Sequence, residues 1–369
     1  MASHSVLCLL AFLFLAETTS LSLPTPASVL KDLSIANSYF ISQPGNAPKA
    51  SSDDCGWTRG TFMSGHMAHY SVSHDSSLLD WGNRWAAVHN WTCDNNWKDA
   101  NFYACGQAYA SLYHTAPADY KLALAITMDH AVQAYTGYDW FWVDALFMGM
   151  SSFFQYSNLT GDDRLLTLAW AEYNATTYGG TNRTSQPGLW DPESNLYWRD
   201  KSYISLRTPS GAKVFWARGC GWAIASMALS IAALPAGHPA AAEFTVRLQA
   251  MAAALVPQQG ADGLWRASLL DAAQYPNPET TGTACFTFAL AWAVNHGILA
   301  ADTYVPVIAR AWAGLSSVSL QSSGLVGWCQ PANGQPAPTT ADATSDFCVG
   351  QFLLAGSEVY RLVTAQSTH

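Results

Sequence analysis

The sequence predicts an all-α fold, a single (α/α)6 barrel in which six inner helices are surrounded by an outer layer. Three observations predict it. Six segments that mix Gly, Ala, Cys and aromatic residues recur along the chain, and each is apolar nearly all round. Between them lie amphipathic segments with apolar residues at three- and four-residue spacing. Repeats of a few tens of residues that alternate these two kinds of helix are typical of stacked helical hairpins, and six inner helices would close a ring.

The six apolar segments are the predicted inner helices, because a helix that is apolar on all sides is buried on all sides. Their small residues allow neighbouring helices to approach closely. These segments begin near Thr58, Asn101, Trp142, Trp216, Thr281 and Ser345. The predicted outer helices span residues 118–135, 162–178, 241–258 and 301–317. The long connection between Tyr156 and Trp216 is rich in Gly, Asn, Pro and aromatic residues, and we expect a loop insertion there, at the rim where the inner helices start.

The amino-terminal end has the form of a secretory signal peptide. Residues 1–20 contain an apolar stretch from Val6 to Ala16 that is too short to span a bilayer, followed by small polar residues. We expect an N-terminal segment and loop over residues 21–50, and a single catalytic domain over residues 51–369. Sequons for N-glycosylation begin at Asn90, Asn158, Asn174 and Asn182. Together these features predict a secreted, extracellular glycoprotein.

Composition and charge exclude some classes of partner. The formal net charge of −9 over 369 residues argues against nucleic acid or an anionic membrane as a partner. Aromatic residues make up 13% of the chain, with 16 Trp, a density typical of sugar-binding clefts, although an aromatic core explains it equally well. We therefore expect an oligosaccharide substrate as partner, no nucleic acid, no membrane, and a monomeric protein.

The cysteines predict both disulfides and buried thiols. Without Cys8 of the leader, seven of the eight cysteines remain, so an oxidising compartment leaves at least one thiol unpaired or paired with another chain. Two pairs flank loop-like segments and are candidate disulfides, Cys55 with Cys93 and Cys329 with Cys348. Three others lie in apolar helical runs and are expected to pack as small hydrophobic residues, namely Cys105, Cys220 and Cys285. The sequence has no CxxC motif and no His-rich cluster, so we expect no metal and no cofactor.

One aspartate lies in an otherwise apolar, aromatic run. The stretch "WFWVDALFMGM", residues 140–150, contains Asp144 at the expected first turn of a buried helix. Burial there would raise the pKa of its carboxyl and make it a credible proton donor. The alternative is that Asp144 caps its own helix. The surrounding rings of Trp140, Phe141 and Trp142 also suit the face of a sugar and favour the catalytic interpretation.

Other polar and aromatic residues at the starts of the inner helices are expected to converge on a cleft. Arg218 lies between Trp216 and Trp222 in "FWARGCGW", an arrangement that suits a ring bearing a carboxylate, with a structural salt bridge as the alternative. Arg199 in "LYWRDKSY" either contacts substrate or pairs with Asp200. The remaining residues at this predicted rim are Trp57, Arg59, Asp99, Asn101, Trp142 and Glu279.

Several of these motifs resemble one family of glycoside hydrolases. "WVDALFMG", "LYWRDKSY", "KVFWARGCGWAIA", "DGLWRASLLDAAQYPNPETTGTACFTFALAWAVNHG" and "VGQFLLAGSEVY" occur in the order found in unsaturated rhamnogalacturonyl and unsaturated glucuronyl hydrolases. The resemblance runs from about Trp57 to Tyr360 and implies an (α/α)6 barrel. It also implies removal of a terminal 4,5-unsaturated uronic acid by hydration of its vinyl ether, with Asp144 as the catalytic acid.

The chain departs from this family's pattern at three positions. Many members have a pair of aspartates before the Gly-Gln at Gly106, where this chain has Asn101-Phe102 with Asp99 slightly upstream. Asn101 is therefore the candidate for the second catalytic position, by hydrogen bonding to the substrate. The alternative is that Asp99 substitutes for the missing acid after a shift of half a helical turn. Cys220 replaces an Asn in the Arg-Gly-Asn-Gly-Trp motif, and Arg199 stands where some members carry His.

Two other classes of function fit the same barrel. A conventional glycosidase needs two carboxylates at a set separation, and a sugar epimerase needs several histidines at the inner rim, whereas the motifs here offer Asp and Arg. A lectin-like protein that binds without turnover is favoured only by Asn101. The sequence does not distinguish substrates derived from rhamnogalacturonan, another pectin, an algal polymer or a glycosaminoglycan.

Overall fold

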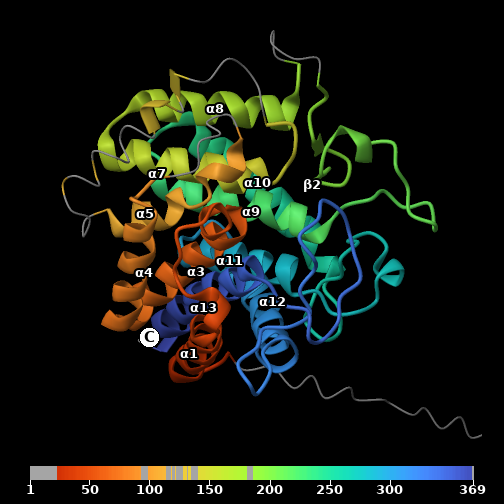
Figure 1. Ribbon diagram of the computed structural model, residues 1–369. Coiled ribbons are helices and arrows are strands. Elements are labelled where there is room, and N and C mark those ends of the chain that lie inside the picture. The colour runs from red at the N-terminus through yellow and green to blue at the C-terminus, as the bar shows by residue number, and fades with distance from the viewer. Residues whose placement is uncertain are drawn as a thin grey trace, which may run out of the picture.

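The computed structural model describes residues 23–92, 99–113, 118, 121, 128–130, 132–133, 140–180 and 186–367. Within them the chain forms the predicted barrel of helices (Figure 1). The inner layer contains α3 (Trp57–Ser73), α5 (Gly106–Leu112), α7 (Ser151–Thr160), α9 (Ala217–Ala233), α11 (Thr280–Asn295) and α13 (Asp346–Ser367). The short helices η2 (Ala100–Tyr103) and η3 (Leu146–Met150) precede α5 and α7.

The inner helices form a closed ring. Each of these helices contacts the next along the chain, from α3 to α5, α7, α9, α11 and α13, and α13 contacts α3 again. Small residues bring the backbones together, as predicted. A Cβ added to Gly65 of α3 would lie 1.9 Å from the carbonyl oxygen of Gly350 in α13, so the closing contact of the ring requires glycine. The six inner helices expected from the sequence are thus confirmed.

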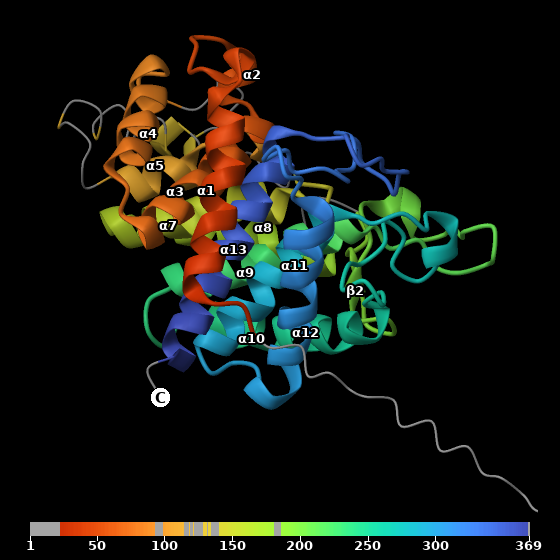
Figure 2. The same cartoon turned by 90° about the horizontal axis from the view of Figure 1, so that it is seen from below.

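An outer layer of amphipathic helices surrounds the ring (Figures 1 and 2). Its helices are α1 (Pro26–Ser42), α4 (Ser76–Val88), α8 (Asp163–Tyr178), α10 (Pro239–Leu255) and α12 (Ala301–Gly314). Side-chain caps begin several of them: Thr25 accepts from the Ser28 amide, and Asp75 accepts from the Ser77 amide. The outer helix expected at 118–135 falls mostly outside the described residues.

The segment before residue 50 differs from the expectation, because α1 is part of the barrel. Val29, Leu33 and Phe40 recur at helical spacing and are buried, and α1 packs against α13. Pro26 at the start of the helix has the fixed φ that suits a first helical turn. The boundary expected at residue 50 therefore does not separate this segment from the folded body.

Short elements and loops cover the rim where the inner helices start. The insertion after α8 contains the antiparallel strands β1 (Trp190–Asp191) and β2 (Leu196–Tyr197), with Trp190 paired to Tyr197. The connection from η7 (Leu315–Ser319) to α13 has no helix or strand. The remaining short helices are η1 (Pro44–Asn46), α2 (Ser52–Cys55), η4 (Lys201–Tyr203), η5 (Val256–Gln258) and η6 (Ala272–Gln274).

The disulfide between Cys329 and Cys348 is confirmed and ties the last loop to the first turn of α13. The other candidate pair includes Cys93, which lies outside the described residues. The cysteines expected to be packed in helices are buried, as predicted, at Cys105, Cys220 and Cys285. Across the described part of the chain, every helix is too short or too polar to cross a bilayer.

Candidate active site

Asp144 lies just before η3, and its backbone is fixed by the strand-like segment at residues 199–200. The Val143 amide donates to the Arg199 carbonyl oxygen at 2.9 Å, and Trp142 pairs with Asp200 in an isolated antiparallel bridge. The Asp144 carbonyl accepts from the Met148 amide at 3.1 Å, which begins the helical turn. The position of Asp144 is therefore set by main-chain contacts on both sides.

One oxygen of the Asp144 carboxyl caps no helix. Its Oδ2 is buried and has no hydrogen-bond partner among the described residues, and its side chain is 14% exposed. Burial raises the pKa of Asp144 above the usual range, against the opposing charges of Arg199 and Arg218. This carboxyl therefore keeps its proton at a higher pH than an ordinary aspartate does.

Arg199 connects Asp144 to a second carboxylate. Its Nη1 donates to Asp200 Oδ2 at 2.6 Å, while its Nε lies 4.0 Å from Asp144 Oδ2. Asp200 also accepts from the Ser202 amide at 2.8 Å. Burial opposes ionisation of Asp200, but the hydrogen bonds from Ser202 and Arg199 outweigh it and lower the pKa of this carboxyl. The pKa values of the two acids are thus shifted in opposite directions.

The loop between η7 and α13 forms the opposite wall. A Cβ added to Gly334 would lie 2.9 Å from Arg199 Cζ, so the loop backbone is in close contact with the guanidinium. Tyr203 donates to Gln335 Oε1 at 3.4 Å and bridges the loops. Sequence reasoning did not identify Tyr203, Gly334 or Gln335, although Tyr203 belongs to the "LYWRDKSY" motif.

Arg218 is not at the cleft surface where the sequence analysis placed it. Its side chain is fully buried, and its Nη2 donates to the carbonyl oxygens of Pro331 and Asn333, each at 2.9 Å. The guanidinium lies over Trp216 at 4.4 Å and over Phe347 at 4.9 Å, so Phe347 takes the place expected for Trp222. Burial lowers the pKa of Arg218 to about 10, although the nearby acids Glu279 and Asp144 act to raise it. Both terminal nitrogens are used to hold the loop.

The tryptophans at this rim differ in exposure. Trp222 is fully buried and packs edge-on against Trp57 at 6.5 Å between ring centroids. Trp142 is nearly buried and lies against the exposed ring of Phe141 at 4.8 Å. Trp216 donates its indole N–H to Gln330 Oε1 at 3.0 Å. Trp57 and Trp142 thus remain candidates for contact with a sugar ring, whereas the side chains of Trp216 and Trp222 are packed inside the protein.

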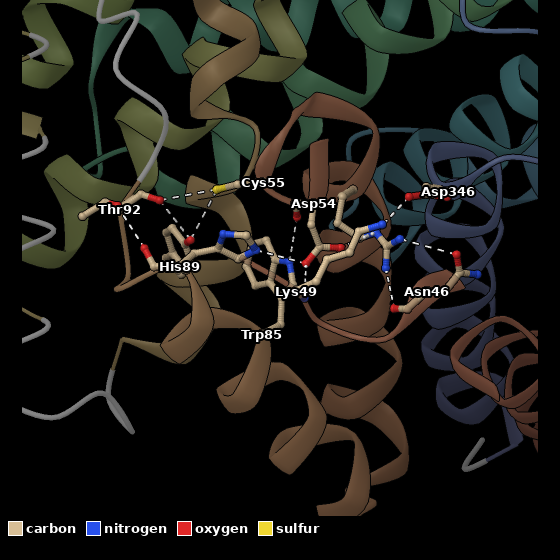
Figure 3. A network of polar contacts seen from close by, with 10 residues as sticks. Asn46, Lys49, Asp54, Cys55, Trp85, His89, Thr92 and Asp346 are labelled. Atoms are coloured by element: carbon tan, nitrogen blue, oxygen red, sulfur yellow. Dashed lines mark hydrogen bonds and ion pairs between the residues drawn. The ribbon is translucent and has the colours of Figure 1, made fainter. Parts of the chain in front are cut away.

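Arg59 contacts the polar network that contains Asn46, Asp54 and Asp346, which are labelled in Figure 3. Its Nε donates to Asp346 Oδ2 at 2.8 Å, and its Nη1 donates to the Asn46 carbonyl at 2.8 Å. A third contact reaches the buried Asp54 at 3.4 Å, which in turn pairs with His89 at 3.0 Å. The network joins the starts of α3 and α13 to η1 and α4. These contacts correct the expectation that Arg59 binds substrate.

The acids at two other helix starts act as caps. Asp99 accepts from the Asn101 amide at 3.0 Å and begins η2. Glu279 is buried and accepts from the amides of Thr281 and Gly282 at 2.6 and 2.7 Å. Burial raises the pKa of Glu279. Asn101 is partly buried in η2, which packs against η3 beside Asp144.

The described residues contain no group of three or more His, Cys, Asp or Glu side chains placed to hold a metal ion. The arrangement offers instead a buried carboxyl with a raised pKa, a partly exposed guanidinium and aromatic walls. Such a site can donate a proton to a substrate that carries a negative charge.

Comparisons with known proteins agree with this architecture. The family model described as Glycosyl Hydrolase Family 88 matches residues 35–363. An unsaturated 3S-rhamnoglycuronyl hydrolase of Formosa agariphila is 34% identical over 229 residues, which cover 60% of this chain and 58% of that protein. A protein of the same name from Alteromonas sp. is 33% identical over 220 residues, covering 60% of this chain and 51% of the relative. These matches span little more than half the length of either relative.

Solved structures match over nearly the whole chain. A glycosyl hydrolase family 88 structure from Bacteroides vulgatus has a TM-score of 0.82 at 28% identity and covers 92% of this chain and 100% of its own. An unsaturated glucuronyl hydrolase from Streptococcus agalactiae has a TM-score of 0.64 at 14% identity, covering 92% of this chain and 93% of its own, and shares the fold.

Proposed function

Because the chain belongs to glycosyl hydrolase family 88, we propose that it removes a terminal 4,5-unsaturated uronic acid from oligosaccharides produced by polysaccharide lyases. The observation that carries this proposal is the buried Asp144 carboxyl, whose Oδ2 has no hydrogen bond among the described residues and lies 4.0 Å from Arg199 Nε. The names of the two curated relatives, both unsaturated rhamnoglycuronyl hydrolases, support the same class of substrate.

The proposed reaction is hydration of a vinyl ether. Asp144 donates its proton to C4 of the C4=C5 double bond, and positive charge develops at C5 beside the ring oxygen. Water adds at C5, and its proton returns to the Asp144 carboxylate. The resulting hemiketal opens and releases the shortened saccharide. The step needs one acid that is neutral before the reaction and stabilised as an anion after it.

The surroundings of Asp144 support both halves of this requirement. Burial raises the pKa of the carboxyl and keeps the proton available, whereas Arg199 favours the carboxylate that forms after transfer. The ionised Asp200 pairs with Arg199 and limits the charge that Asp144 experiences. We assign Asp144 as the proton donor and Asp200 as a positioning residue that acts through Arg199.

We assign recognition of the substrate carboxylate to Arg199. Its side chain is 27% exposed, and only Nη1 is bound to Asp200 at hydrogen-bond distance. The planar fork of an arginine suits a carboxylate, which lies next to C5 in an unsaturated uronate. Arg218 serves the same site indirectly, since its hydrogen bonds to Pro331 and Asn333 hold the loop that contacts Arg199. Trp57 and Trp142 are assigned to the faces of the sugar.

A catalytically impaired carbohydrate-binding protein is the second candidate, and the observation that favours it is Asn101. This amide stands where relatives in the family pattern carry an acid, and the nearby Asp99 is used to begin η2. In the leading proposal Asn101 hydrogen-bonds the substrate and Asp144 supplies the proton alone.

We further propose that the protein is a secreted, monomeric glycoprotein. The apolar leader and the four sequons support secretion, and Asn158, near the end of α7, is exposed. Treatment of protein from a eukaryotic secretory host with an N-glycanase should lower its apparent mass. Light scattering at the peak of a sizing column should give the mass of one chain.

The proposed reaction is tested with a panel of lyase-generated oligosaccharides from rhamnogalacturonan, other pectins, algal polymers and glycosaminoglycans. Loss of the ultraviolet band of the conjugated double bond measures hydration. We expect turnover of at least one unsaturated oligosaccharide and none of its saturated counterpart. Binding of the panel without loss of the band would favour the impaired carbohydrate-binding protein. Cleavage of saturated glycosides would indicate a conventional glycosidase.

A further inference from the structure

A second cavity lies at the end of the barrel opposite Asp144. It has a volume of about 590 Å³ and is lined by α3, α5, α7, α9, α11 with its C-cap, and α13. Its mouth includes Ser71 and Ala232, close to the carboxyl ends of α3 and α9. The residues around Asp144, by contrast, gather at the amino ends of the inner helices. The volume falls within the range of about 300–1,000 Å³ usual for small-molecule sites.

The floor of this cavity is apolar and aromatic. Phe288, Trp292 and Met67 line it and are almost completely buried. The ring of Trp292 stacks on His296 at 4.2 Å between centroids, which fixes the plane of the indole. These side chains give the cavity an apolar floor.

Neutral polar groups surround that floor. Gln107 uses its amide within the protein, since it accepts from Ser64 at 2.9 Å and donates to the Phe147 carbonyl at 2.7 Å. Gln155 and Tyr70 line the cavity, are only partly buried, and have side chains with no hydrogen-bond partner among the described residues. These two side chains can bind the hydroxyl groups of a ligand.

The charges of the cavity disfavour an anion. Glu358 and Arg361 pair with each other at 2.5 Å, and Asn295 also donates to Glu358 at 3.0 Å. Their charges cancel, while the carboxyl ends of the surrounding helices present partial negative charge. An anionic saccharide is therefore disfavoured here, unlike at Arg199.

We propose that this cavity is a second binding site, for a neutral saccharide of one or two rings. The apolar floor contacts the C–H groups of the ring, and Gln155 and Tyr70 bind its hydroxyl groups. This site is separate from the hydrolytic one. The choice of ligand rests on the proposed function, because removal of the terminal uronic acid leaves a shortened saccharide.

The experiment measures binding of methyl α-L-rhamnoside, methyl β-D-glucoside and sodium glucuronate by saturation-transfer NMR. Ala232→Trp places an indole at the mouth of the cavity, and Val246→Trp, on the exposed face of α10, is the matched control. We expect a neutral glycoside to bind the wild type and the control, with little binding of glucuronate. Ala232→Trp should abolish that binding while thermal unfolding shows a folded protein.

Gln155→Leu is a second variant that keeps the side-chain volume and removes only hydrogen-bonding groups. It should weaken binding of the neutral glycoside by about three- to tenfold, the usual effect of one hydrogen bond. The proposal is overturned if neither neutral glycoside binds the wild type, if Ala232→Trp binds as well as the control, or if glucuronate binds equally well. Hydrolysis of unsaturated oligosaccharides is measured separately, so its absence bears on the proposed reaction alone.

Discussion

Asp144 Oδ2 lies 4.0 Å from Arg199 Nε, and neither atom has a hydrogen-bond partner among the described residues. The main-chain bond from the Val143 amide to the Arg199 carbonyl, 2.9 Å long, sets this separation. The two groups are close enough to affect each other's charge but too far apart to share a hydrogen bond. The charge of Arg199 therefore influences the proton donor without a hydrogen bond between these two atoms.

Asp144→Asn should abolish turnover, with kcat reduced by about a thousandfold or more, because the amide has no proton to donate at C4. Substrate binding and the fold should persist, since the volume hardly changes. Loss of the ultraviolet band measures turnover, and calorimetry measures binding. Asp302→Asn, on the first turn of the outer helix α12, is the matched control and should behave as the wild type. A near-normal rate for Asp144→Asn would exclude it as the donor.

Arg199→Gln should move the alkaline limb of the pH–rate profile to higher pH. Arg199 lowers the pKa of Asp144 against the effect of burial, so its removal raises that pKa further. The active form is the protonated acid, and its loss then begins at a higher pH. The KM for the unsaturated uronate should rise as well. An unchanged profile with an increased KM would show that Arg199 binds the substrate but does not affect the pKa of Asp144.

Asn101→Asp should increase turnover if an acid at this position assists addition of water. Asn101 lies in η2, which packs against η3 beside Asp144, and its amide cannot take up a proton. The increase should appear in kcat above the pKa of the new carboxyl and disappear below it. Equal or lower activity at every pH would indicate that Asn101 already serves as a hydrogen-bonding ligand.

Arg218→Lys should lower the free energy of unfolding by about 1.5–3 kcal/mol, the scale of a hydrogen bond to a charged group. Lysine cannot reach the carbonyl oxygens of Pro331 and Asn333 at once, nor stack flat between Trp216 and Phe347. Denaturant titration measures the loss. If the variant is as stable as the wild type but no longer distinguishes the free uronate from its methyl ester, Arg218 recognises the substrate carboxylate after all.

The stability of the protein should fall as the pH decreases from about 6.5 to about 4. Burial lowers the pKa of both His66 and His69 to about 4, from 6.5 in the unfolded chain. The unfolded state then binds more protons than the folded state throughout this interval. The stability that the two buried histidines contribute is therefore complete above pH 6.5 and lost by pH 4. The loss is on the order of 3 kcal/mol for each histidine. Denaturant titrations across the interval should show a reduced slope in His69→Gln but not in His296→Gln, an exposed control.

The helices were predictable from the sequence because burial on one or all sides leaves a local periodic pattern. The α4 helix was missed, since Gly82 interrupts its pattern. A Cβ at this position would lie 2.9 Å from Met67 Sδ, so the methionine side chain packs closely over the glycine. The burial of Asp144 was also predictable, because its apolar neighbours are adjacent in the sequence.

The functions of the arginines were not predictable in the same way. Arg59 pairs with Asp346, and Arg218 with carbonyl oxygens near residue 331, and these partners are more than a hundred residues away along the chain. Flanking tryptophans indicate an aromatic environment but not whether a guanidinium faces solvent or a loop. Distant backbone carbonyls leave no mark in the local sequence, and three-dimensional contacts alone separate Arg199 from Arg218.

The contact between α13 and both α1 and α3 bears on how the chain acquires its structure. These helices come from opposite ends of the described chain, so the seam of the ring forms only between distant segments. Contacts of this kind slow folding, because a long loop must close before they form. During synthesis the apolar face of α1, with Val29 and Leu33, has no α13 to cover it until residues 346–367 emerge. Ring closure therefore waits for the synthesis of α13, and a nascent chain lacking α13 should depend on chaperones to remain soluble.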